Sequence, residues 1–119
     1  MIVDVTDLKI YQESLNLVEK LYLLINKVSK SEYDTINQIK RSAKSIPANI
    51  AEGFGKRKSG KEFKRFLQIS LGSCDETVTH LRMLYITAPY LKNEIIELAE
   101  NFKILSKRIN KLHSTWISD

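Results

Sequence analysis

Glycine, proline and cysteine are scarce in this chain, whose 119 residues include four glycines, two prolines and one cysteine. So few turn-forming residues disfavour a β fold and favour long helices. The single cysteine, Cys74, excludes an intrachain disulfide and suits a reducing compartment. Long apolar runs are also missing, because the longest, Leu21–Ile25, is far shorter than the roughly 20 residues of a membrane span. The acidic segment 1–7 lacks the features of a signal peptide. We therefore predict a cytoplasmic protein with one domain, residues 1–119, and no membrane partner.

Apolar residues recur at helical spacing along the whole chain. In the first such segment, a stripe with spacings of three and four predicts a helix face toward the core and comprises Leu8, Tyr11, Leu15, Val18, Tyr22 and Ile25. A second stripe beside it comprises Leu17, Leu21, Leu24 and Val28. The two stripes together form an apolar arc around the helix that is wider than packing into one bundle core requires. The second stripe therefore predicts either contact with another subunit or a deeply buried helix.

The second apolar stripe consists of Ile36, Ile39, Ala43, Ile46 and Ile50. Pro47 lies inside this segment and removes a backbone donor, which predicts a kink or a break between Lys44 and Ile46. Gly53 and Gly55 are expected to end the helix.

Ser59 and Glu62 have the spacing of a capping box, which predicts the start of a third helix that Pro89 ends. Its inner face is predicted to comprise Phe63, Leu67, Ser70, Cys74, Val78, Leu81 and Tyr85. Gly72 lies in mid-helix, where glycine costs about 1 kcal/mol relative to alanine. A close approach of another helix would offset that cost, so we expect one at Gly72.

The fourth stripe is the most regular, and Asn93 is expected to cap its helix. It comprises Ile95, Leu98, Phe102, Leu105, Ile109, Leu112 and Trp116. No segment alternates with the period of a strand. The four segments predict an all-α protein, an up-down-up-down left-handed four-helix bundle with short connections.

Positive charge is concentrated between Lys40 and Arg65. This segment holds nine basic residues and two acids, Glu52 and Glu62, so its net charge is +7 (nine minus two), while the whole chain carries +5. The nine are Lys40, Arg41, Lys44, Lys56, Arg57, Lys58, Lys61, Lys64 and Arg65. Such a patch is typical of surfaces that bind polyanions, most often nucleic acid. The alternative is a solvated basic turn that keeps the protein soluble.

The position of these charges favours an anion ligand. Cations at the start of the third helix oppose its dipole, whereas a phosphate there would be favoured by the dipole, the free amides and the cations together. Phe54 is the only aromatic residue expected to be accessible near the loop, because Phe63 is expected to be buried. We therefore predict backbone-dominated, salt-sensitive and largely sequence-independent binding.

Three segments resemble a family of small bacterial proteins, called the four-helix-bundle or 23S ribosomal RNA intervening-sequence-encoded protein family. They are Asp7–Gln12, Gln38–Lys56 and Phe66–Glu76. The most specific part is Ser-Ile-Pro-Ala-Asn-Ile-Ala-Glu-Gly, which begins at Ser45, and the resemblance covers nearly the whole chain. One departure is the loop Lys30–Asp34, which lacks the proline that is common in the family.

The resemblance implies an up-down four-helix bundle that assembles into a ring-shaped homopentamer. The family name records the location of many of its genes inside ribosomal RNA insertions, rather than an activity. A related branch is the accessory protein of diversity-generating retroelements, a basic pentameric barrel that binds nucleic acid and a reverse transcriptase.

Four polar residues are expected near the inner faces of the second and third helices, namely Asn49, Glu52, Ser73 and Glu76. We predict that they form a structural hydrogen-bond network, joined by Arg41 or Arg65, rather than a metal site. A di-iron bundle needs Glu-x-x-His motifs, whereas Glu76 and His80 are four residues apart.

An enzyme is not expected. The segment from Gly55 to Glu62 matches the nucleotide-binding pattern G-x-x-x-x-G-K, but it ends in glutamate, which cannot supply the magnesium-binding hydroxyl, and no strand precedes it. We predict no catalytic residues, no cofactor and no metal. The leading prediction is a non-catalytic homo-oligomer, a pentamer, that binds RNA or DNA through the basic cluster. The alternative is an oligomeric scaffold that binds a protein partner.

Overall fold

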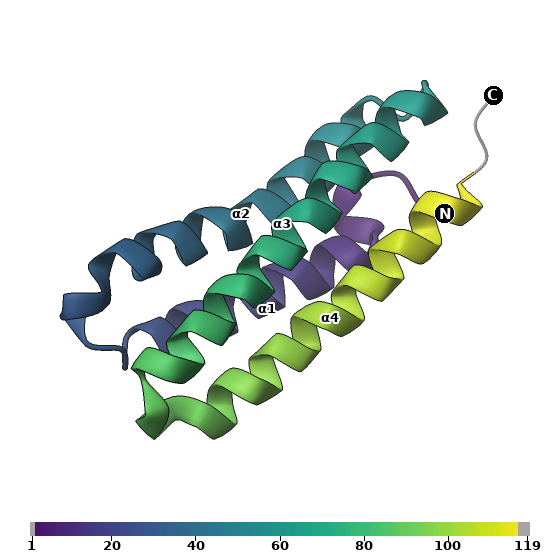
Figure 1. The fold of residues 1–119 in the computed structure, drawn as a ribbon. Coiled ribbons are helices and arrows are strands. Elements are labelled where there is room, and N and C mark those ends of the chain that lie inside the picture. The colour runs from purple at the N-terminus through teal and green to yellow at the C-terminus, as the bar shows by residue number, and fades with distance from the viewer. Residues whose placement is uncertain (1, 117–119) are drawn as a thin grey trace.

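The computed structural model describes residues 2–116, which form four long helices joined by short connections (Figure 1). The helices are α1 (Lys9–Ile25), α2 (Tyr33–Gly55), α3 (Gly60–Thr87) and α4 (Lys92–Thr115). Three short 3₁₀ segments precede α1, α2 and α4, namely η1 (Val5–Asp7), η2 (Lys30–Glu32) and η3 (Pro89–Leu91). The described residues contain no strand. The prediction of an all-α protein with four helices is confirmed.

Each helix packs against two others. The helix α3 lies close to α2 and α4 along many residue pairs, whereas α1 lies close to the same two helices along fewer. Consecutive helices run in opposite directions, so the turn between α2 and α3 lies at the same end as η1 and the last turns of α4 (Figure 1). The result is a rod of 49 × 21 × 19 Å. Within residues 2–116, no helix combines the length and the apolar character that crossing a membrane requires.

The core consists of the stripes predicted for α2, α3 and α4, with three adjustments, the first of which is that Ile36 of α2 is only partly buried. Fully buried side chains come from all three of these helices and include Ile39, Ile46, Ile50, Phe63, Leu67, Leu81, Phe102, Leu105 and Ile109. Tyr85 was expected on the inner face of α3 but is 38% exposed, and Leu84 is buried in its place. At the end of α4, Leu112 and Trp116 are only partly buried and pack against the core from its edge.

The first stripe of α1 was assigned to the core and is only partly buried, with Leu8 and Ile25 in the core and Tyr11 and Val18 packed against it. Leu17, Leu21, Leu24 and Val28 are buried, whereas Leu15 of the other stripe is 46% exposed. The buried stripe is a complete heptad seam that begins at Ile10, but its second position is Ser14. Because serine is polar, it interrupts the apolar spacing, and the full seam was not recognised from the sequence. The serine is tolerated in the core because its hydroxyl donates to the carbonyl of Tyr11 at 2.7 Å.

The helix ends follow the sequence signals in part. Ser59 caps α3, as its Oγ accepts a hydrogen bond from the amide of Glu62 at 3.2 Å. The helix α2 ends at Gly55 as expected, but it continues through Pro47 without a break. A proline removes one hydrogen bond of the helix ladder, and the burial of Pro47 provides packing in compensation. The expected cap at Asn93 is wrong, because α4 begins at Lys92 directly after η3.

Gly53, rather than Gly72, marks the close approach of two helices. A Cβ atom at Gly72 would meet no other atom within 4 Å, so the expected contact there is wrong. At Gly53, a Cβ atom would lie 2.6 Å from the Cβ atom of Phe66 and 3.1 Å from the Cδ1 atom of Phe63. The absence of a side chain at Gly53 therefore allows α2 to pack against the first turns of α3.

Candidate functional site

The nine basic residues predicted as one site lie in two separate groups. Six of them surround the α2–α3 turn and are called here the turn cluster: Lys56, Arg57, Lys58, Lys61, Lys64 and Arg65. The other three, Lys40, Arg41 and Lys44, lie in the first half and the middle of α2 rather than near its end. Lys44 precedes Gly55 by about 17 Å along the helix axis. Sequence proximity therefore does not bring all nine together.

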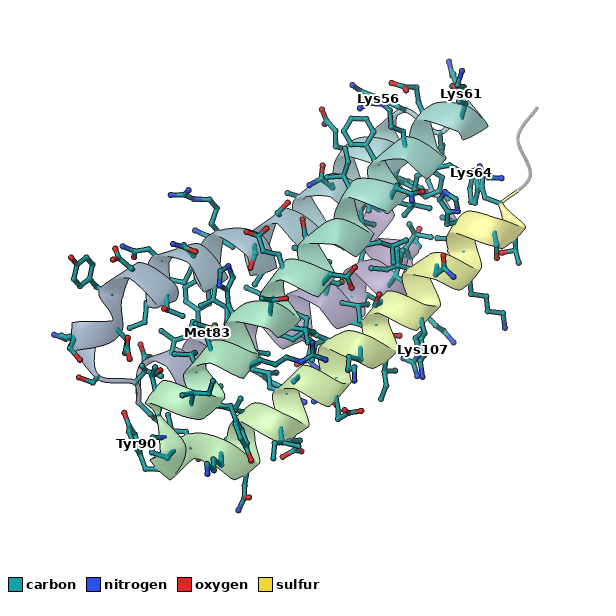
Figure 2. All side chains as sticks on the ribbon, viewed as in Figure 1. Lys56, Lys61, Lys64, Met83, Tyr90 and Lys107 are labelled. Atoms are coloured by element: carbon teal, nitrogen blue, oxygen red, sulfur yellow. The ribbon has the colours of Figure 1, made fainter. Side chains whose placement is uncertain are left out.

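The α2–α3 turn is a hydrogen-bonded connection that ends the bundle. The amides of Lys56, Arg57 and Ser59 donate to backbone carbonyls three residues before them, at 3.0, 3.2 and 3.1 Å. Figure 2 shows the side chains of Lys56 and Lys61 at this end of the bundle, and Lys64 beside the last turns of α4. The turn cluster is thus fixed at the backbone while most of its charged groups remain in solvent.

Aromatic rings lie directly beneath the turn. The ring of Phe63 packs edge-to-face against Phe54 and Trp116, with centroid distances of 6.1 and 4.6 Å. Arg57 stacks on the ring of Phe54 at 3.9 Å, and its Nη1 donates to the Phe54 carbonyl at 3.0 Å. Stacking of a guanidinium on a ring stabilises the pair and limits its motion. Phe54 is therefore occupied by Arg57 and is not free to stack on a base.

Phe66 is a second ring under the turn cluster, and the sequence analysis missed it. Lys56 lies 5.0 Å and Arg65 lies 4.4 Å from its centroid. Its position next to Arg65 in sequence was the only available signal, because the approach of Lys56 depends on the packing of α2 against α3. The rings of Phe54 and Phe66 together position three of the six cations.

Acidic side chains neutralise only part of the turn cluster. Arg65 donates to both carboxylate oxygens of Glu62, at 2.9 and 3.3 Å, and these hydrogen bonds hold the pKa of Glu62 below its usual value. Lys56 lies 3.8 Å from Glu52. Lys58, Lys61 and Lys64 form no ion pair with any residue in 2–116.

The 3₁₀ segment η1 brings one further acid to this end of the bundle. Hydrogen bonds from the hydroxyl and amide of Thr6 lower the pKa of Asp4, and the charge of Arg57 adds to this lowering. Asp4 therefore offsets part of the charge of Arg57. The turn cluster remains strongly positive, and such a surface attracts polyanions.

The polar network expected between α2 and α3 involves only two of its four predicted residues. Asn49 donates to the Ser45 carbonyl and to the Ser45 hydroxyl, both at 2.8 Å, and that hydroxyl lies 2.8 Å from the hydroxyl of Ser73. Glu52 and Glu76 do not join it, because both carboxylates are more than half exposed and remain in solvent. Neither Arg41 nor Arg65 takes part: Arg41 is exposed, and Arg65 pairs with Glu62.

Hydroxyl groups take the place of the expected charged network. Ser42 and Thr77 lie 2.9 Å apart with both side chains buried, and Ser70 donates to the carbonyl of Ile46 at 2.9 Å. Together with the Ser45–Ser73 contact, these bonds connect α2 to α3 at successive turns. They have a structural role, since each fixes the register of two packed helices.

His80 is the one side chain near this network with an unused polar atom. Its Nε2 atom is buried and has no hydrogen-bond partner within residues 2–116, and the nearest carboxylate oxygen, from Glu76, is 3.6 Å away. Residues 2–116 contain no group of three or more side chains that could hold a metal ion, and the buried thiol of Cys74 has a pKa raised to about 12 by burial, with a smaller contribution from the charge of Asp75.

One family model matches the chain, over residues 6–111, and its description is 23S rRNA-intervening sequence protein. The match includes most of α4 and all of α1, α2, α3 and the turn cluster. A comparison with curated proteins found no match.

Proposed function

The chain belongs to the 23S rRNA-intervening sequence protein family, and we propose that it is a non-catalytic, cytoplasmic protein that binds the backbone of RNA or DNA through the turn cluster. The observation that carries this proposal is the gathering of six cations at one end of the bundle, where three of them have no acidic partner in residues 2–116. Unpaired cations at close range repel one another and do not stabilise the fold. A polyanion relieves that repulsion.

The aromatic contacts support a backbone ligand rather than a base ligand. Phe54 and Phe66 are covered by Arg57, Lys56 and Arg65, so neither ring offers a free face for stacking. Guanidinium groups that are already oriented lose less conformational entropy when they bind phosphate. Binding of this kind does not depend on sequence, and it weakens as salt rises, because counterions are released from the nucleic acid.

The test is a comparison of two triple variants that carry the same charge. In the first, Lys56, Arg57 and Lys58 are changed to glutamine. In the second, the control, Lys27, Lys30 and Lys92 are changed to glutamine; they lie near the two connections at the opposite end of the bundle (Figure 1). Binding of fluorescein-labelled RNA and DNA strands is measured by anisotropy over a salt series, and the fold of each variant is checked by circular dichroism.

We expect wild type and control to bind with the same steep salt dependence. The turn variant should lose up to about 2 units from the slope of log K against log salt, because each lost phosphate contact removes roughly 0.7 on a single strand. No binding by the wild type at low salt would refute the proposal. Equal losses in both variants would show that net charge, rather than the turn cluster, governs binding.

We also propose that the left-handed bundle assembles into a cyclic homo-oligomer. Several large apolar side chains remain exposed in a single copy, among them Leu23 (60%), Met83 (51%), Ile86 (73%) and Ile104 (45%). The second stripe of α1, once a candidate for subunit contact, is buried in the bundle and is not available. Five copies are the number that the family resemblance implies. Sedimentation velocity over a concentration series tests this, and a monomer at all concentrations would refute it.

A further inference from the structure

A cleft between α3 and α4, distant from the α2–α3 turn, carries a second group of cations. It has a volume of about 320 Å³, and its charged lining residues are Arg82 on α3, Lys103 and Lys107 on α4, and Asp75 on α3. The hydroxyl-bearing residues Thr79 and Ser106 complete its polar lining. We propose that this cleft is part of a path for one single strand of nucleic acid, which runs from the turn cluster along the groove between α3 and α4. The inference rests on the proposed function.

The cations of this cleft are available to a ligand. Arg82 and Lys107 form no ion pair with any of residues 2–116, and Lys103 pairs only with the exposed Glu100, at 3.7 Å. Three positive charges from two helices line one concave site, and two acids offset part of them, Asp75 in the lining and Glu100 beside Lys103. This arrangement does not favour folding, because like charges on facing helices repel. A chain of phosphates between the two helices would contact both walls.

A neighbouring groove of the bundle provides the contrast. The cleft between α1 and α4 is lined by two lysines, Lys20 and Lys27, and two glutamates, Glu94 and Glu97. Lys27 and Glu94 form an ion pair at 3.0 Å. The charges of that groove balance, so it offers no attraction to a polyanion. The groove between α3 and α4 therefore has an excess of positive charge that the groove between α1 and α4 does not have.

A second hollow between α3 and α4 lies on the side of the cleft toward the turn cluster. Lys64 and Arg65 belong to the turn cluster and also line this hollow with Gln68 on α3 and His113 on α4. Figure 2 shows Lys64 beside the last turns of α4 and Lys107 farther along the same helix, away from the turn. From Lys64 to Arg82 the path follows α3 for about 27 Å, at a rise of 1.5 Å per residue. About eight nucleotides of a strand at ~3.4 Å each span this length.

The shape of the groove favours a single strand over a duplex. Packed helices are about 8–10 Å apart, and a groove between them admits one backbone, whereas a duplex would touch only its rims. One acid, Asp75, lines the cleft itself. A phosphate that passes Asp75 is repelled by it. Replacement of this carboxylate by an amide should therefore strengthen binding, and loss of the fold cannot produce that result.

The experiment measures binding of an oligo-uridine of about eight nucleotides, and of a short RNA duplex, to four proteins beside the wild type. The first is the double variant Arg82→Gln/Lys107→Gln in the groove between α3 and α4, and its control is Lys20→Gln/Lys27→Gln in the groove between α1 and α4. The other two are the single variant Asp75→Asn and its matched control, Glu97→Gln. We expect the first to lower the single-strand salt slope by about 1.4, for two lost contacts. Asp75→Asn should tighten single-strand binding about two- to fivefold at low salt. Both control variants should bind the single strand with the affinity and salt slope of the wild type. Binding of the duplex should be the same for all four variants and the wild type.

The outcomes separate this inference from the function on which it rests. If the wild type binds neither probe, both fail. If the wild type binds and the Lys56/Arg57/Lys58 variant weakens, but the Arg82/Lys107 and Asp75 variants match their controls, the turn cluster binds nucleic acid and the path along α3 and α4 is wrong. Equal effects on duplex and single strand would refute the choice of a single strand.

Discussion

Substitution of two glycines by alanine should change stability in opposite directions. Gly53 and Gly72 both lie inside helices, and neither has a positive φ, so alanine fits the backbone at both positions. In a helix interior, alanine is favoured over glycine by about 1 kcal/mol. This gain is common to the two variants and cancels when they are compared. The difference that remains is the effect of placing one methyl group at each site.

The added methyl group would lie in open space at Gly72, whereas at Gly53 it would collide with packed side chains of α3. No atom lies within 4 Å of a Cβ at Gly72, so Gly72→Ala should raise the free energy of unfolding by about 1 kcal/mol. At Gly53 the new atom would lie 2.6 Å from the Cβ atom of Phe66, which cannot move unless α2 and α3 separate. Overpacking of this kind costs about 1–3 kcal/mol. Gly53→Ala should therefore be less stable than Gly72→Ala by about that amount.

Urea denaturation followed by circular dichroism at one protein concentration measures both variants, and thermal melting provides a second measure. A difference of 1 kcal/mol corresponds to roughly 4 °C in Tm for a chain of this size. If Gly53→Ala is as stable as Gly72→Ala, the close approach at Gly53 does not exist. If Gly72→Ala is the less stable variant, Gly72 is covered in solution and not open as described.

Three more changes test the core. Phe102→Ala should lower the free energy of unfolding by about 3–5 kcal/mol, since the ring is fully buried, and an unchanged urea midpoint would contradict this. Ser42→Ala and Thr77→Val should each destabilise by about 0.5–1.5 kcal/mol, because each removes the contact between the two buried hydroxyls while the hydroxyl that remains keeps its bond to a backbone carbonyl. The double variant should lose less than the sum, and strict additivity in urea unfolding would rule out the bond. Burial raises the pKa of the Cys74 thiol to about 12, so almost no thiolate exists in the folded protein at pH 8. A chromogenic disulfide reagent should therefore react with Cys74 slowly in buffer and fully in urea, and fast reaction in buffer would show an open site.

The sequence predicted the helices well because apolar spacing is a local property. The stripes of α2, α3 and α4 reappear as the core, with Leu84 in place of Tyr85. The buried face of α1 was predicted only in part, because Ser14 interrupts its seam, and a serine whose hydroxyl bonds to its own helix backbone packs like a small apolar residue. The roles of Gly53 and Gly72 depend on which part of another helix lies opposite each glycine. The spacing of residues along one helix does not contain that information.

The candidate site was predicted less completely. The turn cluster is contiguous in sequence and was found, whereas Lys40, Arg41 and Lys44 were joined to it by their proximity in sequence alone. The cations at Arg82, Lys103 and Lys107 were missed because they come from two helices that only the fold places side by side. The same holds for Phe66, whose contact with Lys56 crosses between α2 and α3.

The smaller number of close contacts between α1 and the other helices has a consequence for how the molecule opens. Local opening requires less free energy where fewer apolar contacts are broken, so α1 should separate from the bundle before α2, α3 and α4 separate from one another. Amide protons of α1 would then exchange with deuterium through partial unfolding, and those of α3 only through global unfolding. A detached α1 also exposes its buried seam. At high concentration, that helix can dock into the vacated position of a second copy, which is the event that begins a domain swap.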